Sequence, residues 1–177
     1  FALRYNAAIF IILWNCSRLE EKYLKDGEIL DIGNDNSPGQ IVISGNKTAV
    51  DRVVKNYKEF KIKRAIELPV SAPFHCALMK QVSISMEDPI KELSMIEPEV
   101  SVINNVDAEI VSDPEKIKQN LIRQICGTVK WRESIQKLIS MEVSEFIELG
   151  SGSVLSGLVK RIDKECNSYA VEKIEDI

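Results

Sequence analysis

The order of the elements predicted for residues 7–70 restricts the fold of this chain more than any other feature. Residues 7–13 form a continuous apolar run of strand length. Ser17 and Glu20 have the spacing of a capping box, so a helix is predicted to begin there, and Gly27 is a suitable residue to end it. The chain therefore begins with a strand followed by a helix.

Two strands, a helix and a last strand are predicted next. Residues 28–32 and 40–44 are the two strand candidates, and the polar residues 34–39 between them form a dense turn cluster. Asn46 is placed to cap a helix with apolar residues at helical spacing, and residues 64–70 predict the last strand. Strand, helix, strand, strand, helix, strand is the element order of a ferredoxin-like split βαβ unit.

The rest of the chain alternates between helices and strands, which predicts a mainly parallel α/β layer. Pro89 must start, kink or break the first of these helices. The helices are expected over residues 77–95, 114–125 and 131–139 and after residue 153, and the strands over residues 100–103 and 146–149.

Composition excludes several classes of protein. The 177 residues are 45% hydrophobic and 28% charged, as in a globular protein of one domain, or of one small domain with part of another. A net charge of −4 without a basic run argues against nucleic-acid binding. Four widely spaced cysteines and one histidine argue against a structural zinc site and favour free thiols in a cytoplasmic protein. The apolar residues 7–14 are too few to span a bilayer.

His75 is the only histidine, and it lies in a loop rigidified by Pro69 and Pro73. Histidine is the side chain that exchanges protons near neutral pH, and enzymes place general bases on loops held by ordered structure. A structural histidine is the commoner case when only the residues are considered. The neighbouring Cys76 suggests a Cys–His pair, although adjacent side chains usually point apart.

Two further stretches allow a functional or a structural interpretation. Residues 150–153, Gly-Ser-Gly-Ser, could cradle an anion with backbone amides or could simply turn the chain from a strand into a helix. Asn104 and Asn105, at the end of a predicted strand, could orient a partner or close a turn. A serine nucleophile elbow is absent, because no glycine in the sequence is followed by serine two positions later.

Residues 69–80, Pro-Val-Ser-Ala-Pro-Phe-His-Cys-Ala-Leu-Met-Lys, resemble the catalytic-histidine segment of the malonyl-CoA:acyl carrier protein transacylases. Four more stretches resemble this family in the same order, so that the likeness covers nearly the whole chain from about residue 7. They are residues 36–45, 102–107, 121–131 and 148–158. The sequence departs from the family where Gly-Pro-Gly has become Gly150-Ser151-Gly152 and where Asn-aromatic-Asn has become Asn34-Asp35-Asn36.

The resemblance implies an α/β (α+β) fold in two parts. Residues 1–70 would form a ferredoxin-like small subdomain, and residues 71–177 the C-terminal portion of an α/β-hydrolase-like acyltransferase core. The family's serine elbow, its carboxylate-binding arginine and its oxyanion loop would all precede residue 1. We therefore expect the C-terminal part of the enzyme, a fragment without the serine nucleophile.

The resemblance also implies a reaction, ping-pong transfer of a malonyl group through a seryl ester. His75 would be the general base, and the backbone carbonyl of Gln124 would orient it. The remaining candidate positions, for substrate binding, are Asn34, Gln40, Asn104 and Asn105. The expected substrates are malonyl-CoA and phosphopantetheinylated acyl carrier protein, with no cofactor, metal, nucleic acid or membrane, and with a monomer as the complete enzyme.

Two alternatives to a functional half-enzyme remain open. One is a non-catalytic remnant that at most binds carrier protein or coenzyme A. The other is a free-standing ferredoxin-like binding module with an appended helical layer, for which residues 1–70 should fold alone. A half-enzyme or its remnant should instead expose an apolar edge in residues 71–177, because central strands of that layer would be missing.

Overall fold

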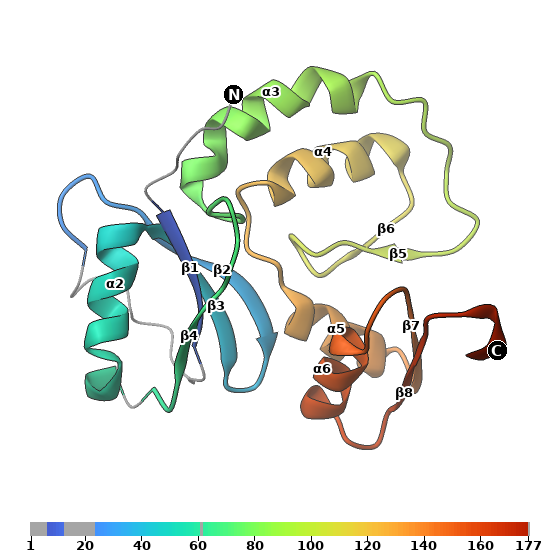
Figure 1. The fold of residues 1–177 in the computed structure, drawn as a ribbon. Coiled ribbons are helices and arrows are strands. Elements are labelled where there is room, and N and C mark those ends of the chain that lie inside the picture. Colours follow the sequence, from blue (N-terminus) through green and yellow to red (C-terminus); the bar gives the residue numbers. More distant parts are fainter. Residues whose placement is uncertain (1–6, 13–23, 61, 177) are drawn as a thin grey trace.

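A four-stranded antiparallel sheet forms one side of the molecule (Figure 1). The computed structural model describes residues 7–12, 24–60 and 62–176. The strand order is β2-β3-β1-β4, and each neighbouring pair is antiparallel. The strands are β1 (Ala7–Ile12), β2 (Leu30–Ser37), β3 (Gln40–Asn46) and β4 (Ala65–Glu67). The mixed α/β class predicted from the sequence is confirmed.

The strand order follows from the connections between the strands. A two-residue turn makes β2 and β3 neighbours, and β1 lies between β3 and β4. This is the strand arrangement of a split βαβ unit. The helix predicted between Ser17 and Gly27 falls mostly outside the described residues, so the ferredoxin-like assignment stays a prediction.

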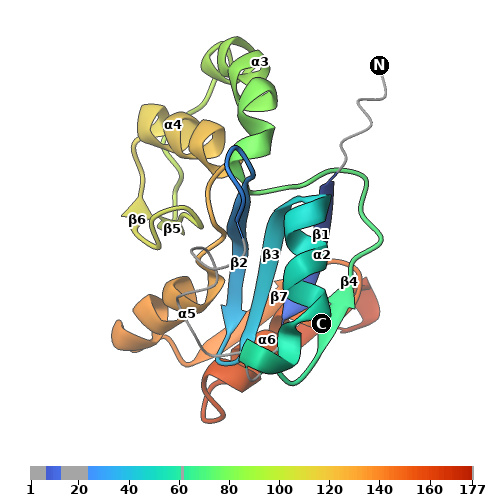
Figure 2. The ribbon, with the colours of Figure 1, turned by 90° about the vertical axis from the view of Figure 1, so that its left-hand side faces the viewer.

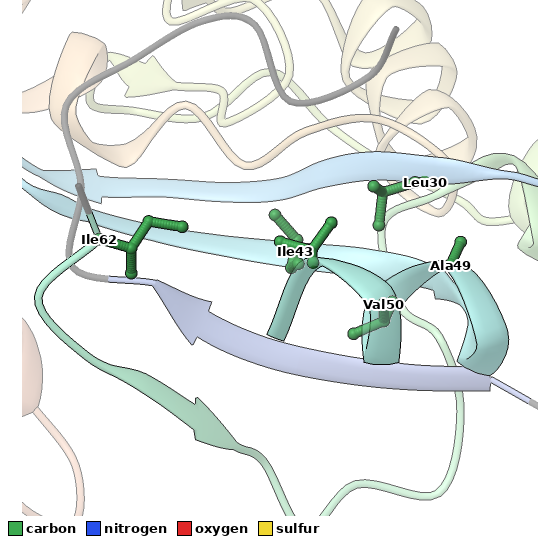
Figure 3. Packing of buried hydrophobic residues seen from close by; sticks show 6 residues of the cluster. Leu30, Ile43, Ala49, Val50 and Ile62 are labelled. Atoms are coloured by element: carbon green, nitrogen blue, oxygen red, sulfur yellow. The ribbon is translucent and has the colours of Figure 1, made fainter. Parts of the chain in front are cut away.

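Helix α2 (Lys47–Lys55) covers one face of the sheet and closes its core. Ile43 of β3 and Val50 of α2 are buried in one apolar cluster between the sheet and the helix. Leu30 and Ile62 belong to the same cluster (Figure 3). Asn46 occupies the N-cap position, as predicted, but its side chain does not cap the helix. Its Oδ1 instead accepts a hydrogen bond from the Ile29 amide at 2.7 Å and thereby joins α2 to the start of β2.

The β2–β3 hairpin is longer than predicted. Four residues of the expected turn cluster, 34–37, belong to β2, and only Pro38 and Gly39 form the turn. The strand tolerates polar residues here because its register shifts at two places and because its edge pairs with Val129. The last strand is shorter than expected, since only Ala65–Glu67 of residues 64–70 pairs with β1.

Helices α3 (Lys80–Lys91) and α4 (Pro114–Gln124) pack against each other beyond the sheet (Figure 1). Helix α3 follows the 3₁₀ turn η2 (Ala77–Met79) and ends two residues after Pro89, so the predicted helix over 77–95 is shorter than expected. Helix α4 begins as predicted, because the Asp113 carboxylate accepts from the Glu115 amide at 3.0 Å. The segment of chain that connects the two helices contains strands β5 (Val102–Ile103) and β6 (Ile110–Val111), which form an antiparallel hairpin.

The last part of the chain forms a parallel β-α-β unit with a small core of its own. Strands β7 (Glu145–Leu149) and β8 (Asn167–Val171) pair in parallel, and α6 (Val154–Ile162) connects them. Helix α5 (Trp131–Ser140) packs against α6 around Ile135, Val159 and Cys166. Strand β8 was not predicted from the sequence. The predicted mainly parallel layer is only partly parallel, because β7 and β8 pair in parallel while β5 and β6 are antiparallel. The short helices η1 (Tyr57–Phe60) and η3 (Ile174–Asp176) complete the fold.

Strand β2 joins the sheet to the rest of the molecule (Figure 2). The Asp35 amide donates to the Val129 carbonyl at 2.9 Å, and the Val129 amide donates to the Gly33 carbonyl at 2.8 Å. The Arg132 guanidinium binds the Asp35 carboxylate at 2.6 Å, and α5 and α6 both contact β2. The predicted boundary between residues 70 and 71 remains a prediction, but these bonds show how the two predicted parts are held together.

Replacing Gly45 with alanine should destabilise the sheet. A Cβ at this position would lie 2.2 Å from the Ile29 carbonyl oxygen, a backbone atom that cannot move alone. We expect Gly45→Ala to lower the free energy of unfolding in urea by about 2–3 kcal/mol. The control is Gly157→Ala, inside α6, where nothing lies within 4 Å. It should raise that free energy by about 1 kcal/mol, because alanine is the better helix former. Equal effects of the two substitutions would contradict this account.

The ion pair between Glu28 and Arg52 should make stability depend on pH in acid. Hydrogen bonds from Arg52, Thr48 and the Lys25 amide lower the pKa of Glu28 from 4.5 to about 2. The folded state therefore binds the proton less readily than the unfolded state, and this stabilisation is present above pH 4.5 and lost as the pH falls towards 2. Urea midpoints measured across this range should fall less steeply for Glu28→Gln than for the parent chain.

Glu67→Gln, the same chemical change on an exposed strand residue, is the matched control and should keep the parent's slope. If Glu28→Gln and the parent lose stability in parallel, Glu28 does not carry this pH dependence.

Candidate functional site

The His75 side chain is held by a backbone carbonyl from a distant part of the chain. Its Nδ1 lies 2.8 Å from the carbonyl oxygen of Gln124. Because a carbonyl oxygen only accepts, Nδ1 must carry the proton, which leaves the Nε2 lone pair of the neutral ring free to accept another. His75 is partly buried and keeps some exposure to solvent. A fixed imidazole with a free Nε2 can act as a general base.

The backbone of His75 is itself unusual, with φ of 60° in the left-handed region. Non-glycine residues seldom adopt this conformation, and those that do are concentrated at functional sites. Two hydrogen bonds hold the loop, one within it and one to β2. The buried Cys76 thiol donates to the Pro73 carbonyl at 3.1 Å, and the Ala77 amide donates to the Asp31 carboxylate at 2.8 Å. The strain at His75 is thus supported by contacts on its C-terminal side.

Gln124 can serve His75 because it is the last residue of α4. Carbonyl groups in the last turn of a helix have no partner within the helix, so they are free to accept from elsewhere. The Gln124 side chain is also engaged, since its Nε2 donates to the Gly127 carbonyl at 2.7 Å. The contact expected between His75 and the Gln124 carbonyl is therefore present, while the catalytic role of the pair stays a prediction.

Asn104 closes the turn of the β5–β6 hairpin. Its side chain accepts from the Asp107 amide at 2.8 Å and donates to the Glu109 carbonyl at 2.8 Å. The structural interpretation of Asn104 accounts for these bonds without a substrate. Asn105 differs, because the residue is exposed and its backbone carbonyl accepts from the Lys130 amide at 2.8 Å. Both residues line a cavity of about 180 Å³ together with Gln124.

Asn34 and Gln40 lie on the β2–β3 hairpin, away from that cavity. Asn34 is the β2 residue that pairs with Val129, and Gln40 accepts a hydrogen bond from Arg161 of α6. Neither residue belongs to the lining of that cavity, whose described residues come from the β5–β6 hairpin and α4. Their proposed contact with substrate stays a prediction.

A larger open depression of about 510 Å³ borders the His75 loop, and sequence reasoning missed it. Its lining comes from β2, from η2 and the first residue of α3, and from the chain after α4, which are far apart in the sequence. The residues are Asp31, Ile32, Ala77, Lys80, Cys126, Gly127 and Thr128. The one pattern in the sequence that could have indicated this packing against β2 is the apolar stretch Ala77–Met79 directly after His75.

Two amides of the turn of residues 150–153 are engaged by the protein itself: the Gly150 amide donates to the Val171 carbonyl at 3.1 Å, and the Gly152 amide donates to the Glu172 carboxylate at 2.7 Å. The Glu148 carboxylate accepts from the Ser156 amide at 2.8 Å and from the Leu155 amide at 3.0 Å, at the beginning of α6. These bonds, above all that from the Ser156 amide, lower the pKa of Glu148. Gly152 adopts φ of 86°, as expected of a tight turn. The turn interpretation therefore accounts for this stretch.

Metal ligands and membrane spans were sought as well. Within the described ranges, no three histidine, cysteine, aspartate or glutamate side chains come together as a metal site would require. None of the helices described is both long and apolar enough to cross a membrane.

Comparison with known proteins confirms the resemblance identified from the motifs. The chain is 39% identical over 160 residues to the malonyl CoA-acyl carrier protein transacylase of Bacillus subtilis, covering 90% of the chain and 50% of that relative. The corresponding protein of Haemophilus influenzae is 38% identical over 153 residues. The chain thus spans about half the length of the curated relatives it matches. No family model matches it.

Comparison with solved structures finds proteins with the same kind of name. The crystal structure of an acyl carrier protein S-malonyltransferase from Vibrio cholerae superimposes with a TM-score of 0.87 at 40% identity, over 96% of this chain and 56% of that one. A malonyl-transacylase in complex with a type II PKS acyl-carrier protein superimposes with a TM-score of 0.91 at 34% identity, over 97% of this chain and 57% of that one.

The thiol next to His75 should be unreactive. Cys76 is fully buried, and burial raises the pKa of its thiol. The same holds for Cys166, whereas Cys126 is only partly buried. Because the thiolate is the reactive form, iodoacetamide should modify Cys126 well before Cys76 or Cys166 in the native chain. Peptide mapping after timed labelling measures the order, and labelling in urea should abolish it. Fast labelling of Cys76 would contradict this prediction and would support a reactive Cys–His pair.

Proposed function

Because the chain is homologous to the malonyl-CoA:acyl carrier protein transacylases over about half of their length, we propose that it supplies the general base of that acyl transfer. The observation that carries the proposal is the 2.8 Å contact between His75 Nδ1 and the Gln124 carbonyl, which leaves Nε2 free. The base would act with a segment outside the printed sequence that carries the nucleophilic serine. The reaction requires no cofactor, and a cytoplasmic location belongs to the same proposal.

In the first half of the reaction, Nε2 of His75 takes the proton of the serine hydroxyl. The serine oxygen forms a bond to the thioester carbon of malonyl-CoA, and the carbon–sulfur bond breaks. His75 then gives its proton to the departing coenzyme A thiolate. The malonyl group is left on the serine as an ester.

In the second half, His75 takes the proton of the phosphopantetheine thiol of acyl carrier protein. The thiolate attacks the ester carbon, the carbon–oxygen bond breaks, and His75 returns the proton to the serine oxygen. Both halves use the same free nitrogen, so one orientation of the imidazole serves the whole cycle. The hydrogen bond from Nδ1 to Gln124 persists in the charged ring, since both nitrogens then donate.

Exposed apolar side chains support the idea that another segment covers this chain. Leu149 at the end of β7 is 78% exposed, and Val154 at the start of α6 is 70% exposed. Ile147 and Tyr169 expose about half of their surface on the same two-stranded sheet. An apolar cluster of this kind usually marks a contact surface. We infer that the serine-bearing segment lies on it and extends the β7–β8 sheet.

The substrate contacts remain part of the proposal. Asn105 is the better of the two hairpin candidates, because the residue is exposed while the side chain of Asn104 is occupied by the turn. Asn34 and Gln40 would border the path of the pantetheine arm. The division into a ferredoxin-like part and a transacylase core part is supported by the strand order β2-β3-β1-β4 and is proposed on the same footing.

The proposal predicts transfer only after complementation. The chain is mixed with the remaining half of the Bacillus subtilis relative as a separate polypeptide, malonyl-CoA is added, and intact masses are recorded. We expect a malonyl adduct on the added half and its transfer to acyl carrier protein. The His75→Ala chain should reduce transfer by about 10³-fold, because a general base contributes about that much.

One control variant and three possible outcomes make the result decisive. Lys58→Ala, at an exposed position of η1, should leave transfer unchanged. If the two halves associate and no adduct forms, the chain is a non-catalytic remnant. An adduct on this chain alone would show that the nucleophile is present in it, against the proposal. Unchanged transfer with His75→Ala would make His75 a structural residue.

A further inference from the structure

We propose that the ion pair between Arg123 and Asp107 is a positioning device for His75. The pair joins the last turn of α4 to the β5–β6 hairpin, next to the carbonyl that holds the imidazole. Arg123 and Asp107 do not act on substrate. They determine where the Gln124 carbonyl lies and thereby the direction in which Nε2 points. The inference rests on the proposed function only in that His75 is the base.

The last turn of α4 has little freedom. The Cys126 and Gly127 amides both donate to the Arg123 carbonyl, at 3.3 and 2.9 Å, and so fold the chain back directly after Gln124. A Cβ on Gly127 would lie 2.8 Å from Val106 Cγ2 and 3.0 Å from the Arg123 oxygen. The turn therefore packs closely against the hairpin, and a shift of the hairpin must move the turn as well.

The Arg123 side chain bridges the same two elements. Its Nη1 and Nη2 donate to the two oxygens of Asp107 at 2.6 and 2.7 Å, and Nη1 also lies 3.2 Å from the Asn120 amide oxygen. A two-point pair of this type determines direction as well as distance. Asp107 is fixed in turn, because its amide donates to the Asn104 side chain. An unbroken set of bonds thus runs from the hairpin to residue 123, whose neighbour holds His75.

The exposure of the pair distinguishes positioning from stabilisation. The Arg123 side chain is 49% exposed and that of Asp107 is 31% exposed. Ion pairs in such places add little to the stability of the whole fold. Breaking the pair should therefore leave the melting temperature almost unchanged while it changes the state of the imidazole. If the pair had a merely structural role, breaking it would lower the melting temperature and leave the state of the imidazole unchanged.

The single histidine makes a direct test possible, because the ring nitrogens give only one set of signals in ¹⁵N-labelled chain. The spectra are recorded at about pH 8.5, where an ordinary imidazole is neutral, and nitrogen chemical shifts report which ring nitrogen carries the proton. The parent should hold the proton mainly on Nδ1. In Asp107→Asn and in Arg123→Lys, the ratio of Nδ1–H to Nε2–H should fall by about threefold or more. Arg123→Lys keeps the charge and removes only the two-point geometry.

Two further variants and one kinetic measurement complete the experiment. Glu28→Gln breaks an arginine–carboxylate pair beside α2, far from His75 along the chain, and should leave the ratio unchanged. Exchanging the partners, Asp107→Arg with Arg123→Asp, should restore part of the parent ratio. In the complemented enzyme, Arg123→Lys should lower kcat about tenfold with little change in KM, because a misplaced base slows the chemistry after binding.

The outcomes separate this inference from the proposed function. An unchanged ratio in both Asp107→Asn and Arg123→Lys would overturn it. A change in Asp107→Asn alone would show that charge rather than geometry affects the ring, which also overturns it. A changed ratio without malonyl transfer in any complemented chain would uphold the positioning and reject the proposed function.

Discussion

The pairing of β2 with residues 128–129 is the constraint on which the candidate site depends. Two backbone hydrogen bonds join Val129 to Gly33 and Asp35, and the Thr128 hydroxyl donates to the Ile32 carbonyl at 2.6 Å. The same strand holds the His75 loop, through the bond between Asp31 and the Ala77 amide. One strand therefore supports both partners of the bond between His75 and Gln124, and the imidazole and its carbonyl are positioned by a common scaffold.

This arrangement explains why the imidazole of His75 keeps one orientation although the residue lies in a loop. His75 adopts a left-handed backbone conformation, which is costly for a residue with a side chain. The cost is offset by the bond to Gln124 on one side and by the buried Cys76 on the other. The same packing raises the pKa of the Cys76 thiol and keeps it protonated. A fixed imidazole and an inert neighbouring thiol are thus two results of one packed loop.

Sequence patterns predicted the elements well wherever packing only reinforced local preference. Residues 114–124 carry a capping aspartate, proline in the first turn and one apolar face, and the helix forms there. The patterns failed where a distant partner decides. Residues 34–37 read as a turn because they are polar, yet they are strand because β3 and Val129 pair with them. Asn104 and Asp107 are three residues apart, so a bond between them within one turn could be expected from the sequence. No local pattern indicates that Arg123, 16 residues after Asp107, will bind the hairpin.

The sequence by itself determined the family resemblance, the mixed α/β class and the choice of His75 as the candidate base, because these rest on residue types in a fixed order. Only the tertiary structure decided which nitrogen of that ring is free, since the Gln124 carbonyl comes from 49 residues away. It also decided that the amides at the start of α6 are occupied by Glu148. Hydrogen bonds between distant residues depend on the packing of β2 against the rest of the chain, which no stretch of sequence specifies alone.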